Sequence, residues 1–510
     1  MSSEDRHHLA ALDHPDAAWQ GLRVVVTGLG VSGFAAADAL LERGALVTVL
    51  DGGSSAPIQA ERAKVLDILG ARIRLGAAHV SAWPDDIGEV DVVVTSPGWR
   101  PTQPILNHAA RLGIPVWGEV ELAWRMRTRH GAAPWLCVTG TNGKTTTVRL
   151  LESMLTAAGA RALAVGNVGT PVLEAVLHPE PFDVLAVELS SFQLHYASSL
   201  SPLASCVLNV APDHIDWHGS EQAYADAKAR IYERTQVACV YNVQDPATEK
   251  MVTEAEVIEG ARAIGFTLGI PDRSMLGLVE EVLADRAFVA QRADSAAELA
   301  TLSDIDPSGV PAPHMVANVL AAAALARAAG VPPVAVRDGV RAFTPQEHRI
   351  TEVAVIDGVR FVNDSKATNP HAAAASLAAY PDVVWIAGGQ LKGADVDALV
   401  HQAAPRLRSV VLLGADRDEL AKALSRHAPD VAVEEVATPE TKGMPLNVRR
   451  DRLDALMDDV IDVAIRAARR GDVVLLAPAA ASLDMFDSYE ARGDCFTQAV
   501  RRRADSGATS

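Results

Sequence analysis

Short apolar runs alternate with longer alanine-rich stretches along most of the chain, which predicts strands that alternate with helices. Arg23–Thr27 and Leu46–Leu50 are predicted strands on either side of a helix that ends near Arg43. Further strands are predicted at Val90–Val94, Trp135–Thr139, Asp183–Val187, Ala204–Leu208, Ala238–Tyr241, Val383–Ile386, Ser409–Leu413 and Asp472–Leu476. This alternation is typical of parallel sheets covered by helices, so we expect an α/β fold.

Two regions depart from the simple alternation. Glu352–Ile356 and Val359–Val362 flank Asp357-Gly358, which is a strong signal for a β-hairpin. Residues 265–313 contain several Gly and Pro and predict short strands and loops, followed by a helix over His314–Ala329.

Changes in composition and pattern divide the chain. Its 510 residues are enough for about three domains at roughly 150 residues each. We expect a flexible N-terminal extension over residues 1–20 and domains over residues 21–127, 128–344 and 345–510. Residues 436–448 are predicted to be a long flexible insertion.

The charge balance limits the classes of partner. Lys and Arg number 46 against 64 Asp and Glu, a net charge of −18, which argues against a nucleic-acid backbone or an anionic membrane as the main partner. The first residues lack a secretion signal, and no apolar run reaches the ~18 residues that span a bilayer, so we expect a cytoplasmic protein. Four scattered cysteines without a C-x-x-C pair argue against a disulfide framework and a zinc cluster.

A first glycine-rich loop, Gly28-Leu-Gly30-Val-Ser-Gly33, lies between a predicted strand and a helix, with Asp51 after the next strand. This is the pattern of a dinucleotide-binding turn, which would suggest NAD. Close packing of helix on strand explains such a turn equally well. The helix N-terminus could also bind the phosphates of another nucleotide.

A second loop, Gly140-Thr-Asn-Gly143-Lys144-Thr145-Thr146, follows a hydrophobic strand and precedes a helix. Backbone N–H groups in this setting cradle ATP phosphates, with Lys144 at the β- and γ-phosphates and the Thr145 hydroxyl on Mg²⁺. The first glycine stands at 140 and not at the usual distance from Gly143, but the strand–loop–helix context favours a P-loop.

Polar residues follow other predicted strands. Glu188 follows one of them and is well placed to hold Mg²⁺, whereas Asp213-His214 could be a metal site or a simple turn. Lys228 lies on a predicted helix over Glu221–Glu233, where a lone lysine is ordinarily solvated. A P-loop together with several polar strand ends suits a ligase that joins two substrates with ATP.

Polar groups in the last part of the chain have two explanations each. Asn363–Asn369 could form a carboxylate receptor or a polar helix cap. His348-Arg349 could be a charge pair of a linker or a nucleotide contact.

The motifs together resemble the Mur ligase family, ATP-dependent amide-forming enzymes of peptidoglycan precursor synthesis. The resemblance runs from about Arg23 to Phe496 through GLGVSG, TSPG, GTNGKTTT, GNVG, ELSSFQL, NVAPDH, AKARIYE, HR, NDSKATN and APAAASLDMFDSYEARGD, in that order. The segment NDSKATN is similar to the corresponding segment of those family members that add D-glutamate to UDP-N-acetylmuramoyl-L-alanine. The resemblance implies a Rossmann-like UDP-binding domain, a central P-loop ATPase-like domain with a mostly parallel sheet, and a Rossmann-like amino-acid-binding domain. It also implies a monomer that handles small molecules, in the cytoplasm.

The resemblance implies roles for particular residues. UDP would be held by Gly28, Gly30, Val31, Ser32, Gly33, Ser96, Pro97 and Gly98, and the muramoyl part by Asn167. ATP would be bound by Gly140, Thr141, Asn142, Gly143, Lys144, Thr145, Thr146, Asn318, His348, Arg349 and Asp364. Two Mg²⁺ ions would be held by Thr145, Glu188, His214 and a CO₂-derived carbamate on Lys228, so that Lys144, His214 and Lys228 are the catalytic candidates. D-Glutamate would be bound by Lys366, Thr368, Ser482, Leu483 and Tyr489.

The chain departs from the family pattern at three places. His314-Met315 stands where His-Asn is usual, and Pro345–Glu347 replaces a Gly-Leu-Pro before His-Arg. Gly52-Gly53 replaces the Thr/Ser-Arg that contacts uracil. Three alternatives remain at this stage: a related ligase with another amino acid, an NAD-dependent oxidoreductase built on the first loop, and a non-catalytic ATP-dependent switch.

Overall fold

The computed structural model describes residues 9, 11–53, 57–128, 130–307, 310–344, 350–437 and 446–507. Its contacts divide the chain into two compact units. Met1–Val210 with Trp217–Phe343 forms the first unit, and Ala211–Asp216 with Thr344–Ser510 forms the second. Within the described ranges, no helix is long and apolar enough to cross a membrane.

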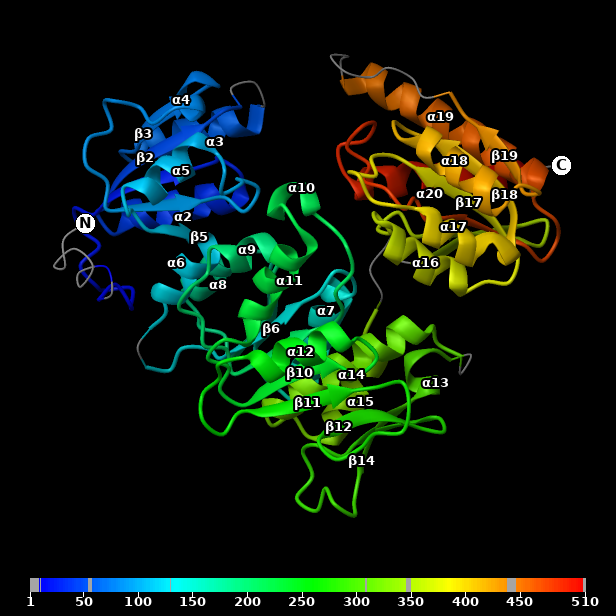
Figure 1. The fold of residues 1–510 in the computed structure, drawn as a ribbon, viewed down its shortest axis with the longest axis horizontal. Coiled ribbons are helices and arrows are strands. Elements are labelled where there is room, and N and C mark those ends of the chain that lie inside the picture. The colour runs from blue at the N-terminus through cyan, green and yellow to red at the C-terminus, as the bar shows by residue number, and fades with distance from the viewer. Residues whose placement is uncertain are drawn as a thin grey trace. The chain divides into compact units, whose positions relative to one another are not determined.

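The first unit begins with a five-stranded parallel sheet in the order β3-β2-β1-β4-β5 (Figure 1). Its strands are β1 (Arg23–Thr27), β2 (Leu46–Asp51), β3 (Arg72–Leu75), β4 (Val92–Thr95) and β5 (Val116–Gly118). The helices are α2 (Val31–Glu42), α3 (Pro57–Ile68), α4 (Ala78–Ser81), α5 (Pro104–Arg111) and α6 (Glu119–Arg125). Val24 and Val26 pack with α2, while Val25 faces the opposite side and packs with α5. Both faces of the sheet are therefore covered, as the apolar strands predict.

The predicted N-terminal extension packs against this sheet. Leu12 and Trp19 are each 1% exposed within the core, and the Trp19 indole N–H donates to the His14 carbonyl oxygen at 2.9 Å. The expectation of a loose extension is therefore wrong for residues 11–20, because these apolar side chains find a place in the core. Residues 1–8 and 10 lie outside the described residues.

The same unit contains a nine-stranded sheet in the order β14-β13-β12-β11-β10-β9-β6-β8-β7. Its strands are β6 (Trp135–Thr139), β7 (Ala162–Gly166), β8 (Val184–Glu188), β9 (Ala204–Val207), β10 (Ala238–Asn242), β11 (Arg262–Phe266), β12 (Met275–Val279), β13 (Val282–Asp285) and β14 (Ala297–Thr301). Seven strands are parallel, and β13 and β14 join one edge antiparallel.

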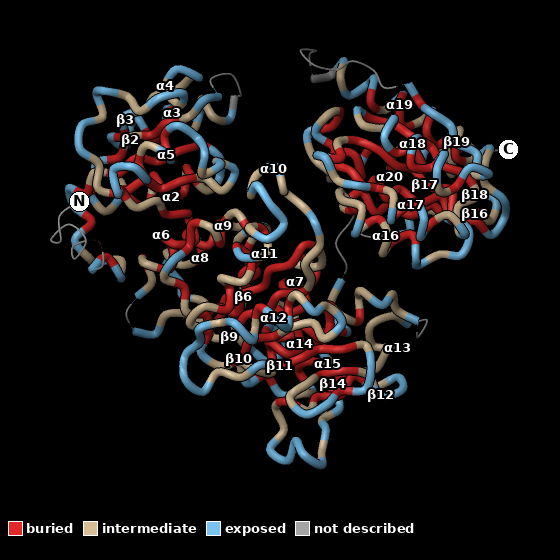
Figure 2. Tube along the Cα trace, viewed as in Figure 1, coloured by how far each residue is buried: buried red, intermediate tan, exposed pale blue. Residues whose placement is uncertain are grey.

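Helices cover both faces of this sheet. They are α7 (Lys144–Ala157), α8 (Val172–Val176), α9 (Ser191–His195), α11 (Glu221–Ala229), α12 (Pro246–Glu254), α13 (Leu302–Ile305), α14 (Pro313–Ala328) and α15 (Pro333–Ala342). Leu136 and Val138 pack with α7 and α14, whereas Cys137 and Val187 join a core that extends to the first sheet. The central strands are accordingly buried throughout (Figure 2).

The second unit holds a six-stranded sheet in the order β15-β16-β20-β17-β18-β19. Its strands are β15 (Thr351–Ile356), β16 (Val359–Asn363), β17 (Val383–Gly388), β18 (Leu407–Leu413), β19 (Ala432–Glu435) and β20 (Val473–Leu476). The helices α16 (Pro370–Ala378), α17 (Asp397–Ala403) and α18 (Arg417–His427) cover one face, and α19 (Leu446–Ala467) and α20 (Tyr489–Gly507) cover the other.

The hairpin prediction is confirmed. β15 and β16 pair antiparallel, and their turn residues Asp357 and Gly358 have φ of 51° and 80°. Such left-handed conformations at both turn positions match the twist of the strands.

Three α/β parts with mostly parallel sheets confirm the predicted fold class. The insertion predicted over residues 436–448 is wrong for 446–448, which begin α19, while 438–445 lie outside the described residues. The helix predicted over Glu221–Glu233 ends at Ala229 and continues as a short 3₁₀ turn over Arg230–Tyr232.

Candidate active site

The first glycine turn lies at the carboxyl ends of β1 and β4. Gly28 has φ of +88°, and a Cβ on it would lie 2.6 Å from Ser96 Oγ, so only glycine fits there. Ser96 Oγ donates to the Gly28 carbonyl oxygen at 3.4 Å. α2 starts immediately after Gly30, which brings Val31, Ser32 and Gly33 to the same place. The structure thus joins the two predicted UDP-binding segments, Gly28–Gly33 and Ser96–Gly98.

Asp51 supports this turn. Its Oδ2 accepts a hydrogen bond from the Leu29 backbone N–H at 2.6 Å, and its Oδ1 accepts one from the Gly53 N–H at 2.7 Å. In a dinucleotide-binding turn this acidic residue would bind the ribose hydroxyl. Here both carboxylate oxygens already hold the loop backbone, which weakens the NAD alternative.

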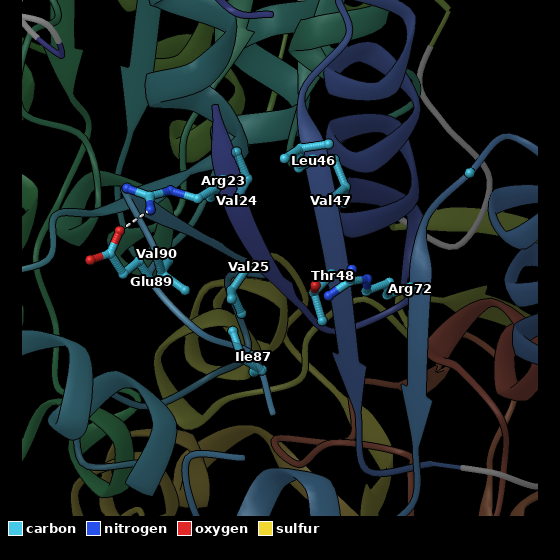
Figure 3. A pocket seen from close by; sticks show the side chains of 11 residues that line it. Arg23, Val24, Val25, Leu46, Val47, Thr48, Arg72, Ile87, Glu89 and Val90 are labelled. Carbon is cyan, nitrogen blue, oxygen red and sulfur yellow. Dashed lines mark hydrogen bonds and ion pairs between the residues drawn. The ribbon is translucent and has the colours of Figure 1, made fainter. Parts of the chain in front are cut away.

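A cavity of about 200 Å³ lies elsewhere on the same sheet (Figure 3). Arg23, Leu46 and Arg72, the first residues of three strands, line it, and Arg23 forms an ion pair with Glu89. Ligands of parallel α/β sheets bind at the carboxyl ends of the strands. This cavity is at the amino ends and is not the candidate site.

The second glycine loop connects β6 to α7. Gly140 and Gly143 have φ of 156° and 85°, and Gly143 is the N-cap of α7. Lys144 Nζ donates to the carbonyl oxygens of Gly140 and Thr141 at 2.8 and 3.0 Å. The lysine therefore folds back over the loop, at the N-terminus of a 14-residue helix that favours phosphate.

Asn209 fixes the shape of this loop. Its side chain accepts from the Asn142 N–H at 2.9 Å and donates to the Asn142 carbonyl oxygen at 3.1 Å, while its carbonyl oxygen accepts from the Thr141 N–H at 3.0 Å. Asn209 was not singled out as a site residue. Its position one residue after a predicted strand end next to the P-loop strand was the signal that could have found it.

Glu188 ends β8 beside the P-loop strand β6. It is 2% exposed, and its Oε1 accepts from Asn167 Nδ2 at 2.8 Å. Its Oε2 is buried without a hydrogen-bond partner among the described residues. An unpartnered buried carboxylate oxygen is costly and is suited to a cation, so Glu188 fits the predicted Mg²⁺ ligand.

Lys228 is buried beneath the P-loop. It is 1% exposed, its Nζ donates to the Gly140 carbonyl oxygen at 2.9 Å, and it lies 4.6 Å from the centre of the Tyr224 ring. The Tyr224 hydroxyl in turn forms a 3.1 Å hydrogen bond with Thr141 Oγ1. Lys228 is therefore not the solvated lysine that is usual on a helix.

Asn318, on α14, also approaches the loop. A Cβ on Gly143 would lie 2.4 Å from Asn318 Oδ1, so a glycine at this position leaves room for the Asn318 side chain. The structure thus brings together Gly140–Thr146, Asn167, Glu188, Lys228 and Asn318.

His214 belongs to residues 211–216, which group with the second unit. It precedes the short helix α10 (Ile215–His218), has φ of 53°, and its Nε2 lies 3.6 Å from Asp213 Oδ2. Its role as a metal ligand with Glu188 stays a prediction.

The second unit gathers the residues predicted for the amino acid. Asp364 and Lys366 follow β16, and Lys366 Nζ lies 3.7 Å from the centre of the Tyr489 ring. Ser376 Oγ donates to Asp364 Oδ2. Thr368 follows Lys366 in the same loop, and the buried Ser482 follows β20, which pairs with β16. Leu483, in contrast, is 60% exposed.

Arg492 joins these loops. It is fully buried and donates to Ser365 Oγ and Ser365 O at 2.9 Å each, and to Ala480 O at 3.1 and 3.2 Å. Burial lowers its pKa to about 9. Its burial cannot be predicted from the sequence, because an arginine in the first turn of a helix is usually solvated.

Lys392 is a further cation close in the fold to Ser482, and no sequence motif marks it. It has φ of 54° and follows the Gly388-Gly389 turn after β17, where Gln390 and Ala481 exchange backbone hydrogen bonds. The exposed cation therefore lies in a loop that is hydrogen-bonded to Ala481, the residue before Ser482. His348 and Arg349 lie outside the described residues.

Comparison with known proteins identifies the family of the chain. The Mur ligase MurD-like N-terminal domain matches residues 22–118, the Mur ligase middle domain 138–326, and the Mur ligase glutamate ligase domain 348–480. A UDP-N-acetylmuramoylalanine–D-glutamate ligase of Streptomyces avermitilis is 56% identical over 95% of this chain and 98% of its own length. The chain belongs to the Mur ligase family.

Other Mur ligases extend the comparison. The proteins of the same name from Thermobifida fusca and Mycolicibacterium smegmatis are 55% and 46% identical, over 95% and 94% of this chain and 99% and 97% of their own. The solved UDP-N-acetylmuramate-alanine ligase of Thermotoga maritima superposes with a TM-score of 0.54 at 17% identity, covering 94% of this chain and all of its own. That likeness supports the shared fold.

Proposed function

We propose that this Mur ligase joins D-glutamate to the L-alanyl carboxyl group of UDP-N-acetylmuramoyl-L-alanine and converts ATP to ADP and phosphate. The observation that carries the proposal is the 46–56% identity, over nearly the whole chain, to relatives named for that reaction. NDSKATN, with Lys366 against Tyr489, supports the choice of amino acid.

The P-loop would bind the ATP phosphates. Its backbone N–H groups and the N-terminus of α7 attract the phosphates, and Lys144 would exchange its two carbonyl acceptors for phosphate oxygens. Thr145 and Glu188 would hold Mg²⁺, which supplies neutralisation of phosphate charge when bound. The orphaned Oε2 of Glu188 supports this assignment.

Lys228 would carry a carbamate formed with CO₂. The carbamate would change a buried cation into an anion that can serve as a ligand of a second Mg²⁺. The burial of Lys228 next to the P-loop, near the place where the ATP phosphates would bind, supports this role.

The chemistry has two steps. The L-alanyl carboxylate attacks the γ-phosphorus of ATP, and the bond between that phosphorus and the oxygen bridging to the β-phosphate breaks. ADP departs, and the L-alanyl group is left as an acyl phosphate. The neutral amine of D-glutamate then attacks the carbonyl carbon, phosphate leaves and the nitrogen loses a proton. No side chain acts as a nucleophile, so positioning and charge neutralisation account for the catalysis. Lys366 would pair with a carboxylate of the incoming amino acid.

The NAD-dependent oxidoreductase and the non-catalytic switch lose their basis, since neither accounts for the whole-length identity to ligases. The reaction uses ATP and a UDP-linked substrate, which suits a cytoplasmic enzyme, and no part of the described site requires a second copy of the chain.

The test is ADP and phosphate release with UDP-N-acetylmuramoyl-L-alanine and each of four amino acids. We expect release with D-glutamate and little with L-glutamate, L-lysine or meso-diaminopimelate, and mass spectrometry should find the product heavier by a glutamyl residue. Lys144→Ala serves as the inactive control. Equal release with L-lysine, or release that needs no amino acid, would contradict the proposal.

A further inference from the structure

Two side chains that no family motif includes flank the first glycine turn. In the sheet order β3-β2-β1-β4-β5, the turn after β1 has the loop and helix after β2 on one side and the loop after β4 on the other. Arg62 of α3 stands on the first side, and Trp99 of the β4 loop stands on the second. This edge, where the strand order reverses, is where nucleotides bind in such sheets.

Arg62 is a half-buried cation directed at the turn. Its Nη1 donates to the Leu29 carbonyl oxygen at 3.3 Å, and its guanidinium lies 5.8 Å from the centre of the Phe34 ring. Within the described ranges, it forms no ion pair with a carboxylate. Its charge is therefore available to an anionic or carbonyl-bearing ligand at the turn.

Two hydrogen bonds hold the backbone of Trp99 on the other side of the turn. Its backbone N–H donates to the Ser96 carbonyl oxygen at 3.1 Å, and its own carbonyl oxygen accepts from the Tyr196 hydroxyl at 2.9 Å. A Cβ on Gly28 would lie 2.9 Å from the indole Nε1, so the indole N–H stands directly beside the turn. Among the described residues, no acceptor takes this N–H.

The two residues that follow β2, Gly52 and Gly53, carry no side chain that could contact a nucleotide. After β2 the chain reads Gly52-Gly53, and a Cβ on Gly52 would lie only 3.0 Å from a methyl group of Val80. The Asp51 carboxylate accepts hydrogen bonds from the backbone N–H groups of Leu29 and Gly53. Arg62 and Trp99 can supply the side-chain contacts to a nucleotide that Gly52 and Gly53 cannot make.

We propose that Arg62 and Trp99 are specificity-determining residues for the UDP-sugar substrate, with Arg62 on the uridine side and Trp99 on the side of the diphosphate and hexose. The direction follows from Tyr196, which ties Trp99 to the part of the chain that carries Glu188 and the P-loop, where the muramoyl end must react. The assignment rests on the proposed function.

The test measures binding of UDP, UDP-N-acetylmuramoyl-L-alanine and ATP by calorimetry with the full chain. Arg62→Gln should weaken UDP and the UDP-sugar alike by about 10- to 100-fold, as for loss of a charged hydrogen bond. Trp99→Phe keeps a ring but loses the N–H, and should weaken the UDP-sugar more than UDP. ATP affinity should not change in either variant.

Two control variants accompany the test, and two outcomes would contradict the expected result. Arg72→Gln changes an exposed arginine at the opposite end of the sheet, and Trp83→Phe changes a tryptophan stacked on His108 at 5.0 Å, so both should bind like the wild type. Unchanged UDP and UDP-sugar affinity in Arg62→Gln and Trp99→Phe, with wild-type ligase turnover intact, would overturn this inference alone. Failure of the wild type to bind UDP or to turn over would overturn the proposed function as well.

Discussion

The buried carboxyl group of Glu119 in α6 accepts a hydrogen bond from the backbone N–H of Leu173 at 2.6 Å. Burial raises the pKa of Glu119 to about 7, above the 4.5 of the unfolded chain. Its protonated form therefore contributes stability that is fully present below pH 4.5 and is lost as the pH rises through about 7. We expect this group to lower the free energy of unfolding by about 2–3 kcal/mol between pH 5 and pH 8.

The measurement is urea denaturation of the wild type and Glu119→Gln at both pH values. The amide cannot ionise, so the variant should lose that part of the pH dependence and be the more stable protein at pH 8. Parallel pH profiles of the two proteins would contradict the prediction.

Glu121, two residues further along the chain, has a pKa shift of the opposite sign. Burial would raise its pKa, but the Arg125 charge and hydrogen bonds from Ser198 and Ser199 outweigh burial and hold the pKa below its usual value. Its ionised form therefore contributes stability above the unfolded pKa, and that stability is lost as the pH falls through the folded pKa. Glu121→Gln should cost about 2–4 kcal/mol at pH 7, measured by urea denaturation, with a smaller cost at acid pH.

Glu188→Gln tests the orphaned oxygen of the metal site. Without a cation, a neutral amide should be at least as stable in this buried position as the carboxylate, so the melting temperature of the ligand-free variant should not fall. With Mg²⁺ and ATP, the wild type should gain melting temperature and the variant should gain much less. A variant that loses stability without ligand but keeps the full Mg²⁺-dependent gain would show that Glu188 is structural.

Lys228→Ala tests the carbamate. Turnover should fall by about 100- to 1000-fold, the scale for loss of one group that stabilises charge in the transition state. Added formate or acetate should restore part of the activity, because a small carboxylate can occupy the place of the carbamate. Lys250→Ala, an exposed lysine of α12, is the matched control and should leave turnover unchanged. An absence of rescue at any carboxylate concentration would count against the carbamate.

Much of the fold follows from local signals. The runs Arg23–Thr27 and Trp135–Thr139 are strands with the predicted bounds, because a buried parallel strand is apolar on both faces. Short strands with polar or mixed residues escaped prediction, such as β3 (Arg72–Leu75) and β19 (Ala432–Glu435), since their pairing decides their conformation. The packing of Trp19 could not be predicted either, because a lone aromatic residue shows no helical or strand periodicity.

The candidate site likewise contains residues that the sequence predicts and residues that it does not. The P-loop and Glu188 can be predicted from the sequence. The loop geometry requires a recognisable glycine pattern, and Glu188 stands at the end of an apolar strand. The burial of Lys228 and Arg492 is not, since a helical lysine or arginine reads as solvated until its tertiary neighbours are known. Asn209 and Asn318 are ordinary residues in sequence, and only their approach to the P-loop distinguishes them.

One carbonyl oxygen, that of Gly140, accepts hydrogen bonds from both Lys144 and Lys228, at 2.8 and 2.9 Å. The two lysines are therefore thermodynamically coupled. Whatever draws Lys144 toward a phosphate changes the electrostatic surroundings of Lys228, and a change in the charge of Lys228 alters the loop that receives the phosphate. Effects of substitutions at the two positions should consequently not add, and the nucleotide-binding lysine and the buried lysine behave as one two-part element.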